Sequence, residues 1–454
     1  MEQTSSQKRL RFTQGSNYFR QRLVLSLLSA RPVKIEEIRS QLSAFELNVG
    51  VAPYEVSFIH LLDSLSNGSK FKINETGTEV GLIPGVLTGG TVTHSCDTSR
   101  PLSYYLEPIL LLAPFCKKPL YLTLKGRLQN DRAGYNSIYK IKHAALPIMD
   151  KFGLEVDLQV KSRGYDDSEI IFKSTVKKQL LTLRTQYSQE VGKVKKIRGL
   201  AYGFRIPPQM LSRIITAAKG EFLPFINDVF FTNDPIKNSK SKMPGYGLAI
   251  YAETTKGIVY ASDDFVGRED SERKEEHTTV VQSKNLDDIQ PGQKRSFELF
   301  PDENDESKGS KKIKHGDENT SEKGRNTIKK SGSSNIVTSP EELALRVARM
   351  LLKEIKSQSR IDSVFQYLVL GLMALSPKDV SSVVLGAITP FTVQFLRDLK
   401  TFFGVTFKVE NYKDKIVNEA DDDEEDFEEN SKTPPLHKLT CLGSGYINLN
   451  KTTV

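Results

Sequence analysis

Apolar helical stripes followed by short strand-like runs recur along the chain. Residues 23–28 form the first stripe, Arg31-Pro32 ends it, and Val33-Lys34-Ile35 then alternates as a strand does. This repetition predicts one α/β domain built from related modules. The same order of helix, turn and strand recurs at residues 109–126, 144–160, 368–386 and 395–409.

A second pattern covers residues 193–260. A strand-like run at 198–206 precedes an amphipathic helix at 207–218, and a further apolar run follows at 229–231. Two more runs, 247–252 and 257–260, flank Thr254-Thr255-Lys256 and predict a hairpin. We expect a small inserted α/β domain here.

Two segments are too polar to bury a core. Asp, Glu, Lys, Ser, Asn and Gly dominate from Asp263 to Val337, which predicts disorder, and order returns where Ser339-Pro340-Glu341-Glu342 makes a helix start. Residues 421–429 are acidic except for Phe427, which favours a solvated loop over a nucleic-acid mimic or a contact for a basic partner. The predicted organisation is a large domain at 1–186, the small domain at 187–262, a disordered insertion at 263–338 and the last part of the large domain at 339–454, with the acidic loop at about 418–432.

Composition narrows the classes of function. No apolar run approaches the length of a membrane span, so we expect no membrane partner. Cys96, Cys116 and Cys441 are far apart and predict free thiols in a reducing compartment, and the six histidines show no metal-ligand spacing. The net charge of +8 favours an anionic partner such as nucleic acid.

Candidate chemistry concentrates in residues 383–400. A strand-like run ends at Gly386, and a helix begins near Thr392, with Val393, Leu396 and Leu399 on one side; a helix start offers unpaired N–H groups to phosphate. Arg397 and Lys400 would clamp a phosphodiester while Asp398 acts as a general base on an RNA 2′-hydroxyl. A solvated helix face, which base rates favour, and a surface for a protein partner are the alternatives.

Two basic clusters allow contact with nucleic acid or entry to the nucleus. Lys193, Lys195, Lys196 and Arg198 suit RNA phosphates or form an exposed linker. Lys294-Arg295 with Lys311-Lys312-Ile313-Lys314 has the form of a two-part nuclear localisation signal.

The order of several short segments resembles the RNA 3′-terminal phosphate cyclases, most closely the branch that acts in eukaryotic ribosome assembly. The resemblance implies a large domain of repeated two-helix, four-stranded units with a smaller inserted domain. The segments are residues 15–35, 66–69, PGVLTGG at 84–90, LAPF at 112–115, KKIRGLAY at 195–202, PGYGLAIYAETTKG at 244–257 and CLGSGYINLNKT at 441–452.

Three departures from that family bear on function. Where the family has a histidine that takes AMP from ATP, this chain has Phe391, which has no nucleophilic nitrogen. The glycine-rich first turn is reduced to Thr13–Asn17, although Arg20 matches a family arginine, and Arg163 precedes Asp166 and Asp167 rather than a glycine run. We therefore expect no cyclase activity and no cofactor, with Arg20 and Arg163 as candidate anion-binding residues.

The resemblance implies a nuclear, nucleolar factor in small-subunit (18S) pre-rRNA processing and 40S biogenesis. The implied partners are a ribosome-assembly GTPase, pre-rRNA and a small nucleolar ribonucleoprotein, the small-subunit processome. A structural or interaction protein is the favoured class. An RNA endonuclease that uses Arg397, Asp398 and Lys400 is the alternative, and an active cyclase is a third reading that Phe391 opposes.

Overall fold

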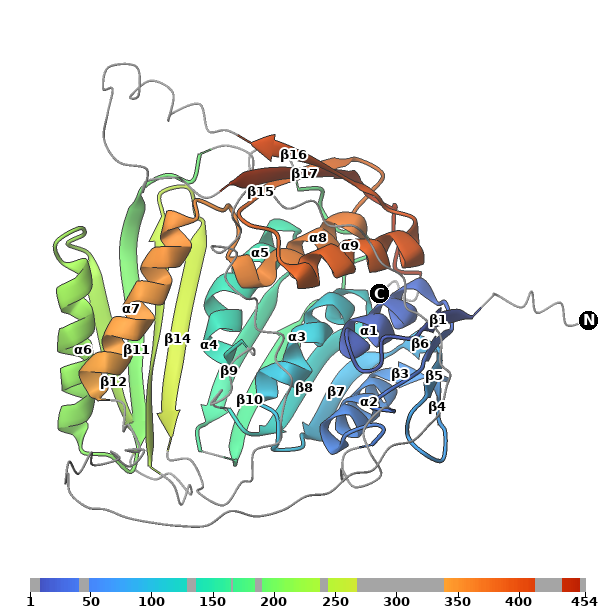
Figure 1. Cartoon of the computed structure of the whole chain (residues 1–454), viewed down its shortest axis with the longest axis horizontal. Helices are drawn as coiled ribbons and strands as arrows, with labels where there is room; N and C mark the ends of the chain where they lie inside the picture. Colours follow the sequence, from blue (N-terminus) through green and yellow to red (C-terminus); the bar gives the residue numbers. More distant parts are fainter. Residues whose placement is uncertain are drawn as a thin grey trace, which may run out of the picture. The chain divides into compact units, whose positions relative to one another are not determined.

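The computed structural model describes residues 9–40, 49–128, 136–164, 166–183, 190–236, 244–267, 339–412 and 435–449. Helices and mixed sheets share these residues, which confirms the predicted α/β class (Figure 1). The predictions for residues 268–338, the nuclear localisation signal and the acidic loop at 418–432 lie outside the described residues.

Among its described residues, the first module contains two helices and a four-stranded sheet. β1 (Leu10–Phe12) pairs in parallel with β2 (Val33–Ile35) across helix α1 (Phe19–Ser29). After α2 (Pro53–Leu65), the chain returns in β4 (Lys70–Ile73) and β5 (Val80–Ile83). The resulting strand order is β1-β2-β5-β4, and β3 (Ser66–Asn67) and β6 (Val86–Leu87) form a separate pair.

The second module repeats this topology. β7 (Gly89–Ser95) runs parallel to β8 (Lys118–Gly126), and β10 (Ser168–Ser174) lies between β8 and β9 (Val156–Ser162). The strand order β7-β8-β10-β9 matches that of the first module. The helical segments are α3 (Leu102–Leu112), η1 (Ala113–Phe115), α4 (Ile138–Lys140), the π-helical turn η2 (Ile141–Ala145) and α5 (Leu146–Lys151).

The last module follows the same plan with three strands among the described residues. Its sheet order, β15-β17-β16, corresponds to the last three strands of the other modules. The repeated unit implied by the resemblance is therefore present. Its elements are η5 (Ser363–Phe365), α8 (Gln366–Ala374), β15 (Val380–Leu385), α9 (Pro390–Phe403), β16 (Phe407–Tyr412) and β17 (Leu436–Leu442).

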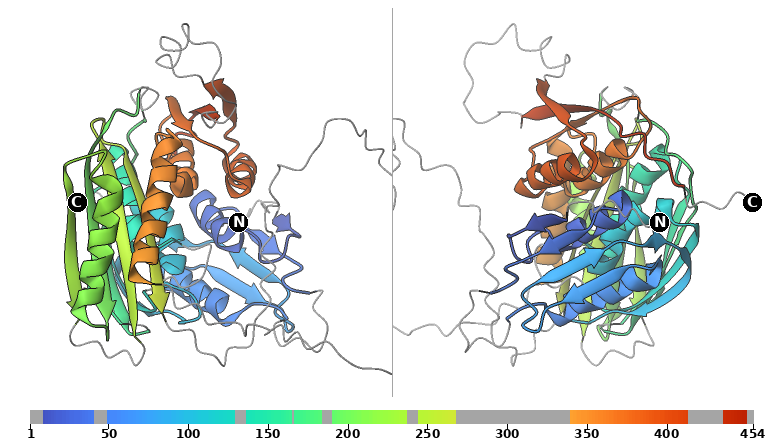
Figure 2. Two further views of the ribbon diagram at one scale, coloured as in Figure 1. Left: turned by 60° about the vertical axis from the view of Figure 1, so that its left-hand side comes forward. Right: turned by 90° about the vertical axis from the view of Figure 1, so that its right-hand side faces the viewer.

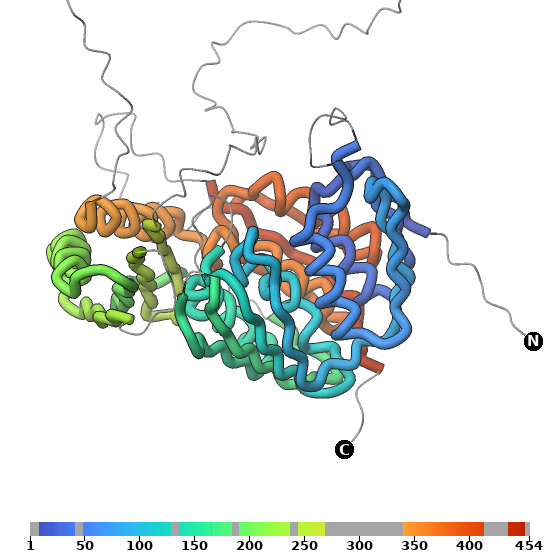
Figure 3. The backbone as a smooth tube through the Cα atoms, turned by 90° about the horizontal axis from the view of Figure 1, so that it is seen from below, coloured from blue at the N-terminus to red at the C-terminus, as the bar shows by residue number. Residues whose placement is uncertain are grey.

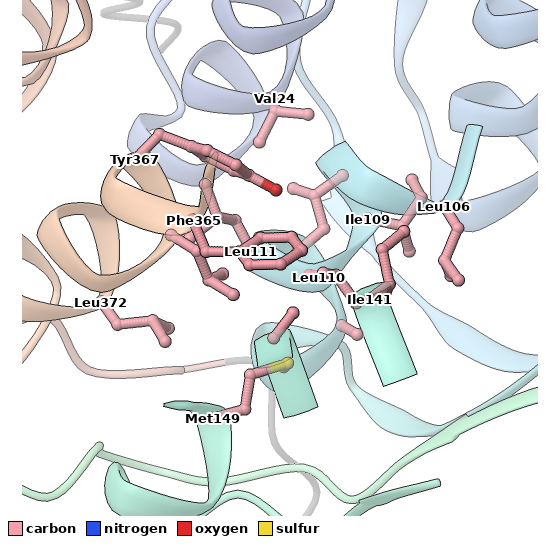
Figure 4. Close-up of a cluster of buried hydrophobic side chains, with 14 of the residues drawn as sticks. Val24, Leu106, Ile109, Leu110, Leu111, Ile141, Met149, Phe365, Tyr367 and Leu372 are labelled. Atoms are coloured by element: carbon pink, nitrogen blue, oxygen red, sulfur yellow. The ribbon is translucent and has the colours of Figure 1, made fainter. Parts of the chain in front are cut away.

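Helices of the modules pack against one another and form the main core. α1 contacts α3 and α9, and α8 contacts α3, α5 and α9; Figure 3 shows the first two modules side by side. All nine residues of α8 are buried, which explains why its sequence shows no polar face. Figure 4 shows the meeting point, where Val24 of α1, Ile109 of α3, Met149 of α5 and Leu372 of α8 converge.

The small domain contains a second core. Its sheet has the order β12-β11-β13-β14, with β11 (Val194–Phe204) parallel to β12 (Val229–Ile236) and antiparallel to β13 (Gly245–Thr254). Helices α6 (Pro208–Phe222) and α7 (Pro340–Lys356) lie beside each other against this sheet (Figure 2). Ile214 and Phe222 of α6 share one buried cluster with Leu343 and Val347 of α7.

Two details of the small domain differ from the predicted boundaries. β14 (Val259–Gly267) continues through residues 263–267, which were predicted to be disordered, because each pairs with a residue of β13. Helix α7 was assigned to the large domain, yet its apolar face packs with α6. Its predicted start is correct, since Ser339 and Glu342 form a reciprocal capping box. Sequence pattern marks the start of a helix but not the sheet that its apolar face covers.

The structure also bears on the predictions from composition. Cys96, Cys116 and Cys441 are free and buried, and burial raises the pKa of the Cys116 thiol to about 12. Within the described ranges, no helix combines the length and apolar character that crossing a membrane requires. The same residues contain no group of three or more His, Cys, Asp or Glu side chains arranged to hold a metal ion.

Candidate functional site

The strand–loop–helix predicted around Phe391 is present. β15 ends at Leu385, and α9 begins at Pro390, two residues before the predicted start. Thr389 caps the helix, because its Oγ1 accepts a hydrogen bond from the Thr392 backbone N–H at 3.1 Å. Thr392 Oγ1 in turn donates to Gln366 Oε1 at 2.9 Å, and the Gln366 amide donates to the Ala387 carbonyl at 3.0 Å. These bonds fix the loop between strand and helix.

Phe391 lies at the first turn of α9 and is 41% exposed. Its ring centroid is 5.9 Å from that of Tyr18, which precedes α1, and 5.9 Å from that of Tyr367 on α8. An aromatic trio therefore occupies the position where the resemblance implies a nucleophilic histidine. Aromatic packing stabilises this corner but supplies no group that could attack a phosphate.

The turn at Thr13–Asn17 lies next to this corner and is held by protein side chains. Arg22 donates to the Gln14 side chain and to the Asn17 carbonyl, and Arg39 Nη1 donates to Ser16 Oγ at 3.1 Å. Gly15 has φ of +56°, and a Cβ there would lie 2.7 Å from the Glu37 carbonyl oxygen. Glycine is thus needed at position 15 because the backbone there is left-handed and leaves no room for a Cβ atom.

The predicted catalytic trio divides between two faces of α9. Asp398 is 1% exposed, whereas Arg397 and Lys400 are exposed. The Asp398 carboxylate accepts hydrogen bonds from the Gln21 amide at 2.5 Å and the Gln394 amide at 2.8 Å. Successive helical residues point about 100° apart, so an acid between two surface cations in sequence does not share their surface.

Arg22 completes the buried polar network of Asp398. Its Nε lies 3.6 Å from Asp398 Oδ2, and its guanidinium lies 4.2 Å from the centre of the Phe12 ring. Burial lowers the pKa of Arg22, and the neighbouring carboxylate opposes this effect. Sequence reasoning missed Gln21 and Arg22, although two long polar residues precede the apolar stripe of α1 directly. The network anchors α9 to α1.

The exposed side of α9 carries a stripe of mixed character. Val393, Arg397 and Lys400 are spaced by four and three residues, so they share one face, and Val393 is 38% exposed. The sequence pattern predicted that Val393 lies on the same side of the helix as Leu396 and Leu399. This prediction is wrong, because Leu399 is buried and Val393 is exposed. We call Val393, Arg397 and Lys400 the α9 surface.

The other predicted anion-binding residues are held by protein groups. Arg20 donates to the Tyr104 carbonyl at 2.5 Å and lies 3.7 Å from Glu107 Oε2. Arg163 forms an ion pair with Asp234 of β12. Their contacts therefore hold α1 to α3 and the second module to the small domain.

The basic cluster at the start of β11 also has acidic neighbours. Lys195 Nζ and Lys196 Nζ each lie 2.6 Å from a Glu253 oxygen, and Arg198 lies 2.8 Å from Asp228 Oδ1. A hydrogen bond to Glu253 raises the pKa of Lys196, and one to Asp228 raises that of Arg198. The cluster lies on the small domain, away from the corner at Phe391.

Comparison with known proteins identifies the protein family. The sequence profile of the RNA 3′-terminal phosphate cyclase family matches residues 12–409, and the chain belongs to this family. It is 36% identical over 445 residues to the RNA 3′-terminal phosphate cyclase-like protein of Mus musculus, covering 96% of each chain. The corresponding human protein is 35% identical over the same coverage. The rRNA processing protein rcl1 of Schizosaccharomyces pombe is 30% identical over 448 residues, again covering 96% of each chain.

Proposed function

We propose that the chain acts in the processing of pre-ribosomal RNA and lacks cyclase activity. The observation that carries this proposal is Phe391, which stands at the helix start of an intact family fold and packs with Tyr18 and Tyr367. The name of the rRNA processing relative from Schizosaccharomyces pombe supports the RNA substrate class. The finer assignment is 18S pre-rRNA processing in 40S biogenesis, in the nucleolus and within the small-subunit processome.

A missing nucleophile has a direct chemical consequence. Phe391 cannot form the covalent adenylate on which the family's cyclisation depends, since a phenyl ring has no lone pair to attack the α-phosphate of ATP. After incubation with ATP, intact-protein mass spectrometry is expected to show no AMP adduct. A stoichiometric adduct would contradict the assignment.

The α9 surface suits a protein partner better than RNA cleavage. Its exposed side chains are one apolar residue, Val393, and two basic residues, Arg397 and Lys400, and arginine beside apolar groups is common at protein interfaces. Cleavage through the 2′-hydroxyl would need Asp398, whose carboxylate is buried and accepts two hydrogen bonds. We assign the α9 surface to the assembly GTPase.

Affinity purification of the tagged chain from growing cells tests the proposal. RNA sequencing of the recovered material is expected to find pre-ribosomal RNA, and mass spectrometry is expected to find an assembly GTPase. An Arg397→Ala, Lys400→Ala variant should lose the GTPase while its stability changes little. Recovery of neither pre-rRNA nor GTPase, with scattered RNAs that bear cyclic phosphate ends, would contradict the proposal.

The endonuclease alternative makes a different prediction. If the three residues cut RNA, Lys400→Ala should abolish cleavage by the purified chain while leaving GTPase binding intact. The docking assignment predicts no cleavage by the purified wild-type chain, and weaker GTPase binding by the Lys400→Ala variant.

A further inference from the structure

One face of the small-domain sheet is only partly covered by protein. Ile197 and Ala201 of β11 pack into the cluster that contains α6 and α7. Because side chains alternate along a strand, Arg198 and Tyr202 point to the opposite face. Tyr202 joins the main core, whereas Arg198, nearer the start of the strand, stays partly exposed.

An exposed aromatic ring lies beside Arg198 on this face. Phe230 of the edge strand β12 is the register partner of Arg198, and Tyr251 of β13 is its partner on the other side. Register partners project from the same face of a sheet, so Phe230, Arg198 and Tyr251 form a row across three strands. Phe230 is 57% exposed, which leaves most of its ring open to a ligand.

The same face already binds one flat ring. His143 of η2 stacks on Tyr251 with ring centroids 4.2 Å apart and an interplanar angle of 10°. Burial, with a smaller effect of Lys142, lowers the pKa of His143 to about 4, so this imidazole is neutral at pH 7. A neutral heteroaromatic ring stacked on a tyrosine shows the geometry that a nucleobase would adopt on Phe230, in the same row.

The charge beside the row is positive. Lys193, Lys195, Lys196 and Arg198 supply four cations, whereas Glu253 and Asp228, their partners, supply two carboxylates, which leaves an excess of two. Lys256 lies next to this cluster, because the backbone N–H of Thr255 bonds to the Lys193 carbonyl at 2.8 Å. Exposed ion pairs contribute little, so phosphates can compete for these cations.

We propose that Phe230, Arg198, Lys195 and Lys196 form a binding surface for single-stranded RNA. Phe230 stacks on a base, and the basic residues contact the flanking phosphates. Stacking of this kind tolerates any base, so the surface holds an unpaired stretch without selecting its sequence. The proposal rests on the proposed function, which supplies pre-ribosomal RNA as the ligand.

The full-length chain and a labelled single-stranded RNA of about 12 nucleotides, a length within the range that such surfaces cover, provide the direct test. Phe230→Ala should weaken binding in fluorescence anisotropy about 5- to 150-fold, since one stacked base contributes about 1–3 kcal/mol. Phe225→Ala is the matched control, because Phe225 is 80% exposed in the loop between α6 and β12. It should leave RNA affinity unchanged.

Either of two results would overturn the RNA assignment: Phe230→Ala binds RNA as the wild type does, or Phe230→Ala and Phe225→Ala lose affinity equally. If Phe230→Ala keeps its RNA affinity and also loses a co-purifying protein, the face is assigned to protein docking instead. Thermal melts of both variants show whether each is folded.

Crosslinking in cells separates this inference from the proposed function. After ultraviolet irradiation, mass spectrometry maps the peptides that carry RNA, and sequencing identifies the RNA. Pre-rRNA crosslinked within residues 229–236 or 194–204 supports both. Pre-rRNA crosslinked only elsewhere overturns the surface but keeps the function, whereas absence of pre-rRNA overturns the function itself.

Discussion

At the scale of single residues, neighbours in sequence have opposite surroundings. Asp398 is buried and contacts Arg22, Gln21 and Gln394, while Arg397 beside it faces solvent. Buried charges persist where they are paired, and removal of one partner leaves the other without compensation. Asp398 therefore holds α9 against α1, which is a structural role.

Replacement of Asp398 should cost stability. Asp398→Ala leaves Arg22 buried and uncompensated, so the free energy of unfolding should fall by about 3–5 kcal/mol in urea titrations. The control Lys400→Ala removes an exposed charge from the same helix and should change it by less than about 0.5 kcal/mol. Equal stability of the two variants would contradict the structural role.

At the scale of elements, periodicity predicted more of the fold than of the site. The helices at α1, α6, α7 and α9 carry apolar stripes that the sequence shows directly. Strand order and the packing of α7 against α6 depend on contacts between distant residues, which local pattern does not encode. The sequence alone could have predicted that Asp398 lies on a different face of α9 from Arg397 and Lys400, because adjacent residues of a helix with 3.6 residues per turn point in different directions.

The turn before α1 gives a prediction at this scale. Gly15→Ala forces a side chain into left-handed backbone and against the Glu37 carbonyl, 2.7 Å from the new Cβ. We expect the free energy of unfolding to fall by more than about 2 kcal/mol in urea titrations, because the cost of the left-handed backbone adds to that of the steric overlap. Gly404, the C-cap of α9, also has positive φ but nothing within 4 Å, so Gly404→Ala should cost only about 1 kcal/mol. A smaller loss for Gly15→Ala than for Gly404→Ala would contradict this account.

At the scale of the whole molecule, a cluster of buried and half-buried charged groups joins the small domain to the modules. Lys140 Nζ of α4 lies 3.4 Å from Asp362 Oδ1, and Asp362 Oδ2 accepts a hydrogen bond from the Ala261 N–H of β14 at 3.0 Å. Burial raises the pKa of Asp263 to about 6, with Lys140 and a hydrogen bond from Ser137 opposing it and Asp264 and Asp362 adding to it. Burial and Asp362 also raise the pKa of Glu354 of α7.

This junction predicts a dependence of stability on pH. The raised pKa means that the folded state holds the Asp263 proton more tightly than the unfolded state, whose pKa is about 4. The stability from this proton is present below pH about 4 and is lost as the pH rises through about 6. The side chain in Asp263→Asn stays neutral at every pH. Relative to the wild type, the free energy of unfolding of this variant should therefore rise by up to about 3 kcal/mol between pH 4 and pH 7. A constant difference in unfolding free energy across this range would contradict the effect.

The central claim is that a member of the cyclase family without its nucleophile serves pre-ribosomal RNA processing. The most direct measurement is the ratio of mature small-subunit to large-subunit rRNA after depletion of the chain from its cells. The account predicts that the ratio falls, that small-subunit precursors accumulate, and that the wild-type chain restores both. An unchanged ratio after full depletion would contradict it.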